Sequence, residues 1–251
     1  MPISSTNEVV SPAGLRVRIL ILSDIHANPW ALRAIEKDVG RVDYVLCAGD
    51  VVNYGPEPGA CIAWLRERGA IVVRGNHDHA VAFHGDPRAA PAKAPLALAM
   101  RDWTRRQLST DDLAWLARLP VRLTWRLDGL DFSLVHATPF DPLFDYHLTP
   151  QADPEQLDVL LAGAPSDIIV AGHTHLPLLR SHRRFEIINP GSAGQPLDGD
   201  FRAAYALWEN GRTVLGRTAY DVSGISQAID ALPLRTAQRR QLQLAVCEGR
   251  L

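Results

Sequence analysis

The chain has 251 residues, 47% of them hydrophobic and 22% charged, a composition that indicates a folded globular protein with one large α/β domain or two small ones. Its 26 Lys and Arg residues balance 28 Asp and Glu residues, so bulk charge directs it neither to nucleic acid nor to a membrane surface. Three cysteines, an odd number without CxxC spacing, argue against a disulfide framework and for a reducing compartment.

The N-terminal region carries no secretory pattern, and the apolar runs are too short for a membrane-spanning helix. Residues 1–16 are polar and contain Pro, Gly and Ser, so we expect a disordered tail there. The remainder, residues 17–251, is expected to form a single domain. On these grounds we expect a cytoplasmic protein.

The domain begins with alternating strand and helix patterns. Residues 17–23 form a near-continuous apolar run, typical of a strand that is covered on both faces. Asn28 and Pro29 then start a helix, as its cap and its first residue. The expected strands are residues 17–23, 42–48 and 71–74. One helix is expected to start at residue 28, and a second is expected to span about residues 58–68. This alternation predicts parallel strands, with a ligand bound outside their carboxyl ends.

Residues 79–119 interrupt the alternation with two helix signals. The first helix is expected at about 95–108 and the second at 111–119, where Ser109 and Thr110 supply the cap. We interpret the segment as a helical insertion over the strand ends, and so over the site. A helical layer far from the site is the equally weighted alternative.

From residue 121 onward, strand patterns are joined by hairpin signals. Asp128-Gly129 and Asn210-Gly211 are typical two-residue turns. The expected strands are 121–127, 130–135, 167–171, 176–181, 185–188, 203–208 and 212–218, and the expected helices are 153–161 and two within 223–249. We therefore predict an α/β fold with two mixed sheets packed face to face and helices outside, a four-layer α-β-β-α sandwich.

Five of the predicted strands end at Asp, Asn or His. The residues at these ends are Asp24, His26, Asp50, Asn76, His136, His173 and His175. Oxygen and imidazole donors without a thiolate suit Mn²⁺, Fe²⁺, Co²⁺, Ni²⁺ or Zn²⁺, and not a structural thiolate site. Seven ligands are too many for one tetrahedral ion and fit two ions that share a carboxylate and a bridging water.

The charge of such a centre favours a phosphate substrate. Two divalent ions exceed the combined negative charge of Asp24, Asp50 and a bridging hydroxide, so the site stays net positive. Asn76, at a position where an Asp could stand, preserves that excess. We expect the ions to lower the pKa of the bridging water, so that hydroxide attacks near neutral pH.

His77 and Asp78 follow the ligand Asn76 directly. His77 need not bind metal, and an imidazole at the mouth of the site is suited to be the general acid for the leaving group. Asp78 could orient this imidazole. A helix cap or a first-turn carboxylate is the alternative role for Asp78, and the sequence leaves both open.

The motif series resembles the calcineurin-like metallophosphoesterases. It consists of Asp-x-His, Gly-Asp, Gly-Asn-His-Asp, a lone His and Gly-His-x-His over residues 24–175. Residues 49–56, 103–104, 108–109 and 189–196 look like a bacterial and archaeal subgroup. The resemblance implies an enzyme, because that subgroup includes phosphodiesterases and hydrolases of dinucleoside polyphosphates.

The resemblance also implies a role for each motif residue. It assigns two ligand sets, Asp24, His26 and His175 for one ion and Asn76, His136 and His173 for the other. Asp50 would bridge the two ions, and His77 would protonate the leaving group. Asn53 and Tyr54 occupy the positions at which protein phosphatases of the superfamily have Asp-Arg, which weakens a protein-phosphatase interpretation. These two residues are the candidate substrate contacts.

We therefore expect a phosphoesterase with two divalent ions, Mn²⁺ foremost, that acts on diester or anhydride bonds of a small nucleotide-type substrate. The alternatives are a phosphomonoesterase or protein phosphatase that uses the same site, and a non-catalytic scaffold with this fold. A DNA nuclease is disfavoured by the net charge of −2. The sequence is compatible with a homo-oligomer and gives no sign of a membrane partner.

Overall fold

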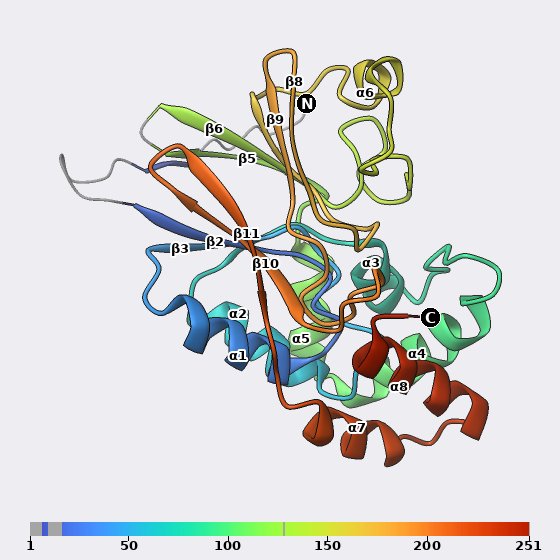
Figure 1. Ribbon diagram of the computed structural model, residues 1–251. Coiled ribbons are helices and arrows are strands. Elements are labelled where there is room, and N and C mark those ends of the chain that lie inside the picture. The colour runs from blue at the N-terminus through green and yellow to red at the C-terminus, as the bar shows by residue number, and fades with distance from the viewer. Residues whose placement is uncertain (1–6, 10–16, 128, 251) are drawn as a thin grey trace.

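The computed structural model describes residues 7–9, 17–127 and 129–250, and two mixed sheets lie at its centre (Figure 1). One sheet contains, in spatial order, β1 (Asn7–Val9), β5 (Arg122–Leu127), β6 (Leu130–Val135), β7 (Ile168–Val170), β9 (Phe185–Asn189) and β8 (Leu178–His182). The other contains β11 (Arg212–Thr218), β10 (Ala203–Glu209), β2 (Arg18–Leu22), β3 (Tyr44–Cys47) and β4 (Ile71–Val72). Both sheets therefore combine parallel and antiparallel pairs, as predicted.

The first three strands of the predicted domain pair in parallel, which confirms the interpretation of the alternating pattern. Ile19 of β2 is in register with Tyr44 of β3, and Leu46 of β3 with Ile71 of β4. The predicted hairpins β5–β6, β8–β9 and β10–β11 are antiparallel. Parallel neighbours end at the same edge of a sheet, so the loops after β2, β3 and β4 are brought together.

The side chains of β2 explain its unbroken apolar pattern. Ile19 and Ile21 point into the core between the sheets, where they join Phe132 of β6 and Val170 of β7. Alternate residues such as Leu20 point to the opposite face and pack against helices. A strand buried on both faces has no position for a polar residue, so its sequence shows no alternation.

Helices cover the outer faces of both sheets, which completes four layers (Figure 1). The helices that contribute to the core outside the five-stranded sheet are α1 (Pro29–Val39), α2 (Pro58–Glu67), α3 (Asn76–Phe83), α4 (Ala94–Gln107), α5 (Thr110–Arg118), α7 (Val222–Asp230) and α8 (Thr236–Glu248). On the other side, α6 (Pro154–Leu160) packs on β7 and β9 through Leu157. No helix of the described chain has the length and apolar character that crossing a membrane requires.

The structure corrects two expectations. Within the predicted N-terminal tail, Asn7–Val9 form β1, which pairs in parallel with β5, whereas residues 1–6 and 10–16 lie outside the described residues. Helix α3, which the sequence analysis implied only through the alternative role of Asp78, begins at Asn76, inside the central motif. Three residues separate it from β4, so a helix N-terminus stands near the strand end where the predicted ligands lie.

Candidate metal centre

The loops that follow β2 and β3 continue side by side beyond the sheet. Asp24 N–H donates to the Gly49 carbonyl at 2.9 Å, and His26 N–H donates to the Asp50 carbonyl at 3.0 Å. From the other sheet, His173 N–H donates to Oδ2 of Asp24 at 3.0 Å. Ligands from both sheets are therefore held against one another by hydrogen bonds from main-chain N–H groups, and the bond between the sheets is accepted by the Asp24 carboxylate.

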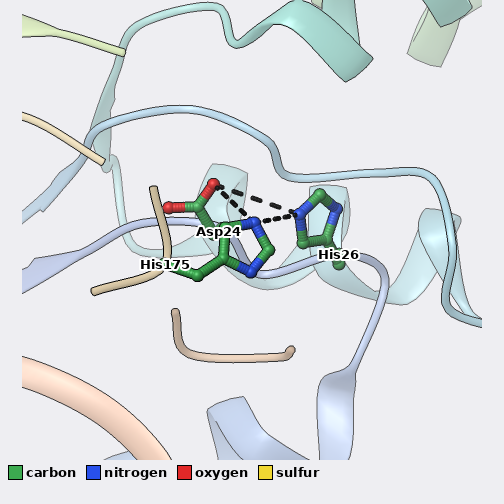
Figure 2. A group of neighbouring side chains, drawn as sticks. All are labelled: Asp24, His26 and His175. Atoms are coloured by element: carbon green, nitrogen blue, oxygen red, sulfur yellow. Dashed lines mark hydrogen bonds and ion pairs between the residues drawn. The ribbon is translucent and has the colours of Figure 1, made fainter. Parts of the chain in front are cut away.

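Asp24, His26 and His175 form one compact group (Figure 2). Nε2 of His175 lies 3.4 Å from Oδ1 of Asp24 and 3.1 Å from Nε2 of His26. All three residues are buried. Figure 2 shows the three side chains turned toward one another, although His175 is about 150 residues from the other two in sequence.

Asp50, His136 and His173 form a second buried group beside the first. Nε2 of His136 lies 3.3 Å from Oδ2 of Asp50 and 3.1 Å from Nδ1 of His173. The same Asp50 oxygen lies 3.8 Å from Nε2 of His26, a member of the first group. Asp50 therefore faces histidines of both groups.

Asn76 completes the second group, and its Oδ1 lies 3.0 Å from Nε2 of His136. Its Nδ2 donates to the Pro87 carbonyl at 2.6 Å, which leaves the amide oxygen toward the group. The structure thus brings together all seven ligands predicted from the sequence.

Backbone carbonyls orient three of the four histidines of the two groups. Nδ1 lies 3.3 Å from the Val52 carbonyl in His26, 2.7 Å from the Ala48 carbonyl in His136, and 2.6 Å from the Gln195 carbonyl in His175. A carbonyl can only accept, so Nδ1 of each ring carries a proton and Nε2 faces the group. This contact at Nδ1 is the usual support of a metal-binding histidine. Burial lowers and the neighbouring Asp50 carboxylate raises the pKa of His136, to about 9 in all, so Nε2 of this ring also carries a proton that a bound cation would displace.

Two atoms of the groups are buried without a hydrogen-bond partner in the described chain, Oδ1 of Asp24 and Nε2 of His173. Such atoms are costly unless a ligand satisfies them. Burial lowers the pKa of His26 and His173 well below 6.5, so both rings are neutral and able to bind a cation. The donor set and the unpartnered Asp24 oxygen fit divalent metal ions.

The motif loops hold their ligands in strained backbone conformations. Asp24, His26, Asp50, His173 and His175 all have φ between 45° and 68°, in the left-handed region that non-glycine residues rarely adopt. Each such residue costs roughly 1–2 kcal/mol. Strain of this kind concentrates at functional sites, because it is tolerated only where the surrounding contacts enforce it.

His77 is oriented by Asn53. Nδ2 of Asn53 lies 2.7 Å from Nδ1 of His77, while Oδ1 of Asn53 accepts from Tyr54 N–H at 3.0 Å. Because the amide nitrogen faces Nδ1, that ring atom accepts and the neutral ring carries its proton on Nε2. Burial also lowers the pKa of His77, so the neutral form is favoured.

No hydrogen bond joins Asp78 to His77 within the described residues, and Asn53 occupies the place at Nδ1 that the orienting role of Asp78 would need. The two carboxylate oxygens of Asp78 instead accept from Val52 N–H at 3.1 Å and from Gly75 N–H at 3.0 Å. The bond from Gly75 is the alternative capping role at the start of α3, and the bond from Val52 ties the loop after β3 to this helix. Asp78 supports the backbone on both sides of the site.

A cavity of about 220 Å³ borders the two groups. Four of the predicted site residues line it, namely Tyr54, His77, His173 and His175. Asn53 does not line it. Tyr54 thus stays a predicted substrate contact, whereas the buried Asn53 side chain contacts His77 and the Ala97 carbonyl.

Three lining residues escaped the sequence analysis, namely Lys93, Tyr146 and Gln195. The Tyr146 ring lies over His173, with centroids 3.7 Å apart. Gln195 belongs to the subgroup motif over residues 189–196 but was not named as a site residue, whereas Lys93 and Tyr146 belong to no recognisable motif. The one signal for Lys93 is that it is one of two lysines in a chain that otherwise uses arginine.

The comparison with known proteins decides the family. Residues 17–211 match the calcineurin-like phosphoesterase superfamily domain. The chain belongs to this superfamily. It is a metal-dependent phosphoesterase, and the two groups around Asp50 are its candidate sites for divalent ions.

Individual relatives agree with this assignment. A crystal structure of a metallophosphoesterase from Sphaerobacter thermophilus is 31% identical, with a TM-score of 0.78, and covers 94% of this chain and 100% of that one. An uncharacterized protein of Methanocaldococcus jannaschii is 29% identical over 81% of this phosphoesterase and 88% of its own length. Phosphodiesterase YfcE of Escherichia coli is 25% identical over 77% of this chain and 88% of its own length.

Proposed function

We propose that this phosphoesterase uses two divalent ions, Mn²⁺ foremost, to hydrolyse phosphodiester or phosphoanhydride bonds of a small nucleotide-type substrate. The observation that carries the proposal is the position of Asp50, whose Oδ2 lies 3.3 Å from His136 and 3.8 Å from His26, one histidine of each group. A single carboxylate between two ligand sets is the arrangement that two closely spaced ions need. Residues 17–251 are proposed to form the one domain that carries this site.

The named relative supports the diester part of the proposal, since YfcE is called a phosphodiesterase. The replacement of Asp-Arg by Asn53 and Tyr54 removes the arginine that grips phosphate in the protein phosphatases. The intact ligand set also disfavours a non-catalytic scaffold.

The residues around the cavity divide the chemistry between them. When bound, the two ions supply Lewis acidity and a nucleophilic water of lowered pKa. His77, with its proton on Nε2 and its ring at the cavity, donates a hydrogen bond to a substrate oxygen that gains charge. In the imidazolium form, Nδ1–H would face the N–H group of the Asn53 amide, so that form is disfavoured. His77 therefore stabilises the negative charge on the leaving group by a hydrogen bond and does not readily transfer a proton to it.

This property of His77 favours good leaving groups. A phosphate leaving group departs as a stable anion, whereas an alkoxide needs a proton. We therefore infer that phosphoanhydrides and activated diesters are better substrates than alkyl diesters. Such a preference fits a nucleotide-type substrate with linked phosphates.

The experiment is a chelation and reconstitution assay with bis(4-nitrophenyl) phosphate. Chelator-treated protein should lose activity and regain it with Mn²⁺, and full activity without metal would overturn the mechanism. His77→Ala should lower kcat by roughly 10²–10³, as expected for loss of one hydrogen-bond donor to developing charge, with metal retained. His84→Ala is the matched control, because His84 is exposed and paired with Asp102; it should keep full activity.

A further inference from the structure

One fixed positive charge borders the cavity. The segment before α4 contributes Ala89, Ala90 and Lys93 to the lining. Among the described lining residues, Lys93 is the one Lys or Arg, and there is no Asp or Glu. A molecule bound in the cavity beside the candidate metal ligands would therefore face the Lys93 cation.

The Lys93 ammonium has no partner within the described residues. Its side chain is half-buried, and it takes part in neither an ion pair nor a side-chain hydrogen bond in that part of the chain. Burial lowers the pKa of Lys93, and no neighbouring carboxylate opposes this. A charge that is partly removed from water without an opposite charge beside it is costly, so an anion from outside the chain would be stabilised next to Lys93.

The cavity offers a second unsatisfied group. Oε1 of Gln195 is buried without a hydrogen-bond partner in the described chain, and Gln195 lines the same cavity. Its main-chain carbonyl accepts from Nδ1 of His175, so the residue is fixed next to a metal ligand. Two polar side chains without partners, one of them charged, thus stand around the space in which a substrate would bind.

The backbone ties Lys93 to the catalytic side of the site. Lys93 N–H donates to the Ala90 carbonyl at 2.8 Å, and the Lys93 carbonyl accepts from Ala97 N–H at 2.9 Å. The Ala97 carbonyl in turn accepts from Nδ2 of Asn53 at 3.3 Å, and Asn53 orients His77. The first turn of α4 therefore has a fixed position relative to His77.

We propose that Lys93 binds a second anionic group, phosphoryl or carboxylate, adjacent to the scissile phosphoryl group, and so selects substrates with two neighbouring anions over simple diesters. The inference rests on the proposed function, in which the two groups around Asp50 hold the scissile phosphoryl. The positive charge of the two ions is enough to neutralise the negative charge of that phosphoryl group. A further cation at the same cavity then complements a further negative charge.

The test compares inhibitors of bis(4-nitrophenyl) phosphate hydrolysis with one and two anionic groups, in excess Mn²⁺. Pyrophosphate is compared with phosphate, and phosphonoacetate with methylphosphonate, so the second group is phosphoryl in one pair and carboxylate in the other. In Lys93→Gln, the preference for the two-anion inhibitor should fall about 10- to 100-fold, as expected for a charge-assisted hydrogen bond. Lys93→Arg should retain most of the preference.

The control is Lys37→Gln, which changes the other lysine, an exposed residue in the last turn of α1, and should leave every inhibition constant unchanged. Pyrophosphate also binds Mn²⁺ in solution, but this effect is common to all variants, so the difference between variants reports on Lys93. Thermal unfolding and metal content establish that Lys93→Gln is folded and loaded.

A loss of preference in either inhibitor pair supports the proposal and identifies the second anion. An unchanged preference in Lys93→Gln overturns it. An equal weakening of one- and two-anion inhibitors also overturns it, because Lys93 would then hold the scissile group itself. If the wild type does not hydrolyse the diester with any metal, the proposed function fails. Calorimetric titration of the loaded variants with pyrophosphate then tests Lys93 without turnover.

Discussion

Asn53 and His77 are joined by a 2.7 Å contact between Nδ2 and Nδ1, and this contact fixes the proton of the neutral ring on Nε2. A carboxylate at position 53 would accept from Nδ1–H and stabilise the imidazolium form. An amide nitrogen does the opposite. The identity of residue 53 therefore sets whether His77 donates a hydrogen bond or a proton.

The first prediction concerns Asn53→Asp. The new carboxylate should raise the pKa of His77 by about 1–3 units, because an adjacent negative charge favours the protonated ring. Activity on an alkyl nucleotide diester, relative to bis(4-nitrophenyl) phosphate, should rise about tenfold or more. The measurement is the dependence of kcat on the leaving group.

Asn53→Ala is the matched control for this variant. It removes the contact without adding charge, so kcat should fall and the leaving-group preference should not reverse. If Asn53→Asp and Asn53→Ala showed the same leaving-group dependence, residue 53 would have no influence on the protonation of His77.

The second prediction concerns metal content. Asp50→Asn should reduce the bound metal from about two ions per chain to fewer than one, because both groups lose their shared carboxylate. His175→Ala should lose about one ion, since His175 belongs to the first group only. Elemental analysis after dialysis measures both. Retention of two ions by Asp50→Asn would show that Asp50 is not shared.

The third prediction concerns Gly75. A Cβ atom at this position would lie 2.0 Å from Oδ1 and 2.4 Å from N of Asp50, so the backbone of the loop would have to move. Gly75→Ala should destabilise the protein by about 1–3 kcal/mol and weaken metal binding. Urea unfolding and metal content report the two effects.

Gly59→Ala in α2 is the control for Gly75→Ala. Nothing lies within 4 Å of a Cβ at Gly59, and alanine is the better helix former. We expect unchanged metal binding and equal or slightly higher stability. A Gly75→Ala protein with normal stability and metal content would contradict the close approach to Asp50.

The fourth prediction concerns Asp78→Asn. Asparagine can accept one of the two backbone hydrogen bonds made by Asp78, and its amide nitrogen then faces the other N–H. The cost should be about 1–3 kcal/mol of unfolding free energy, measured in urea. A large loss of kcat at unchanged stability would mean that Asp78 acts on His77 after all.

The sequence by itself determined the fold class and the set of candidate metal ligands. Apolar runs that end in Asp, Asn or His fix which residues reach the sheet edge, because parallel strands deliver their carboxyl ends to one place. The resemblance to the calcineurin-like phosphoesterases then divided these residues into two ligand sets with Asp50 between them. The cap of α1 at Asn28 was equally local, since its side chain accepts from Ala31 N–H three residues on.

Only the tertiary structure decided which side chains act on one another within the site. Asn53, and not Asp78, contacts His77, and the loop after β3 turns through left-handed conformations at Asn53 and Tyr54, with φ of 74° and 64°. Lys93 and Tyr146 reach the cavity from segments without a motif. Such contacts depend on how distant loops pack, and a strand-end pattern contains no information about that packing.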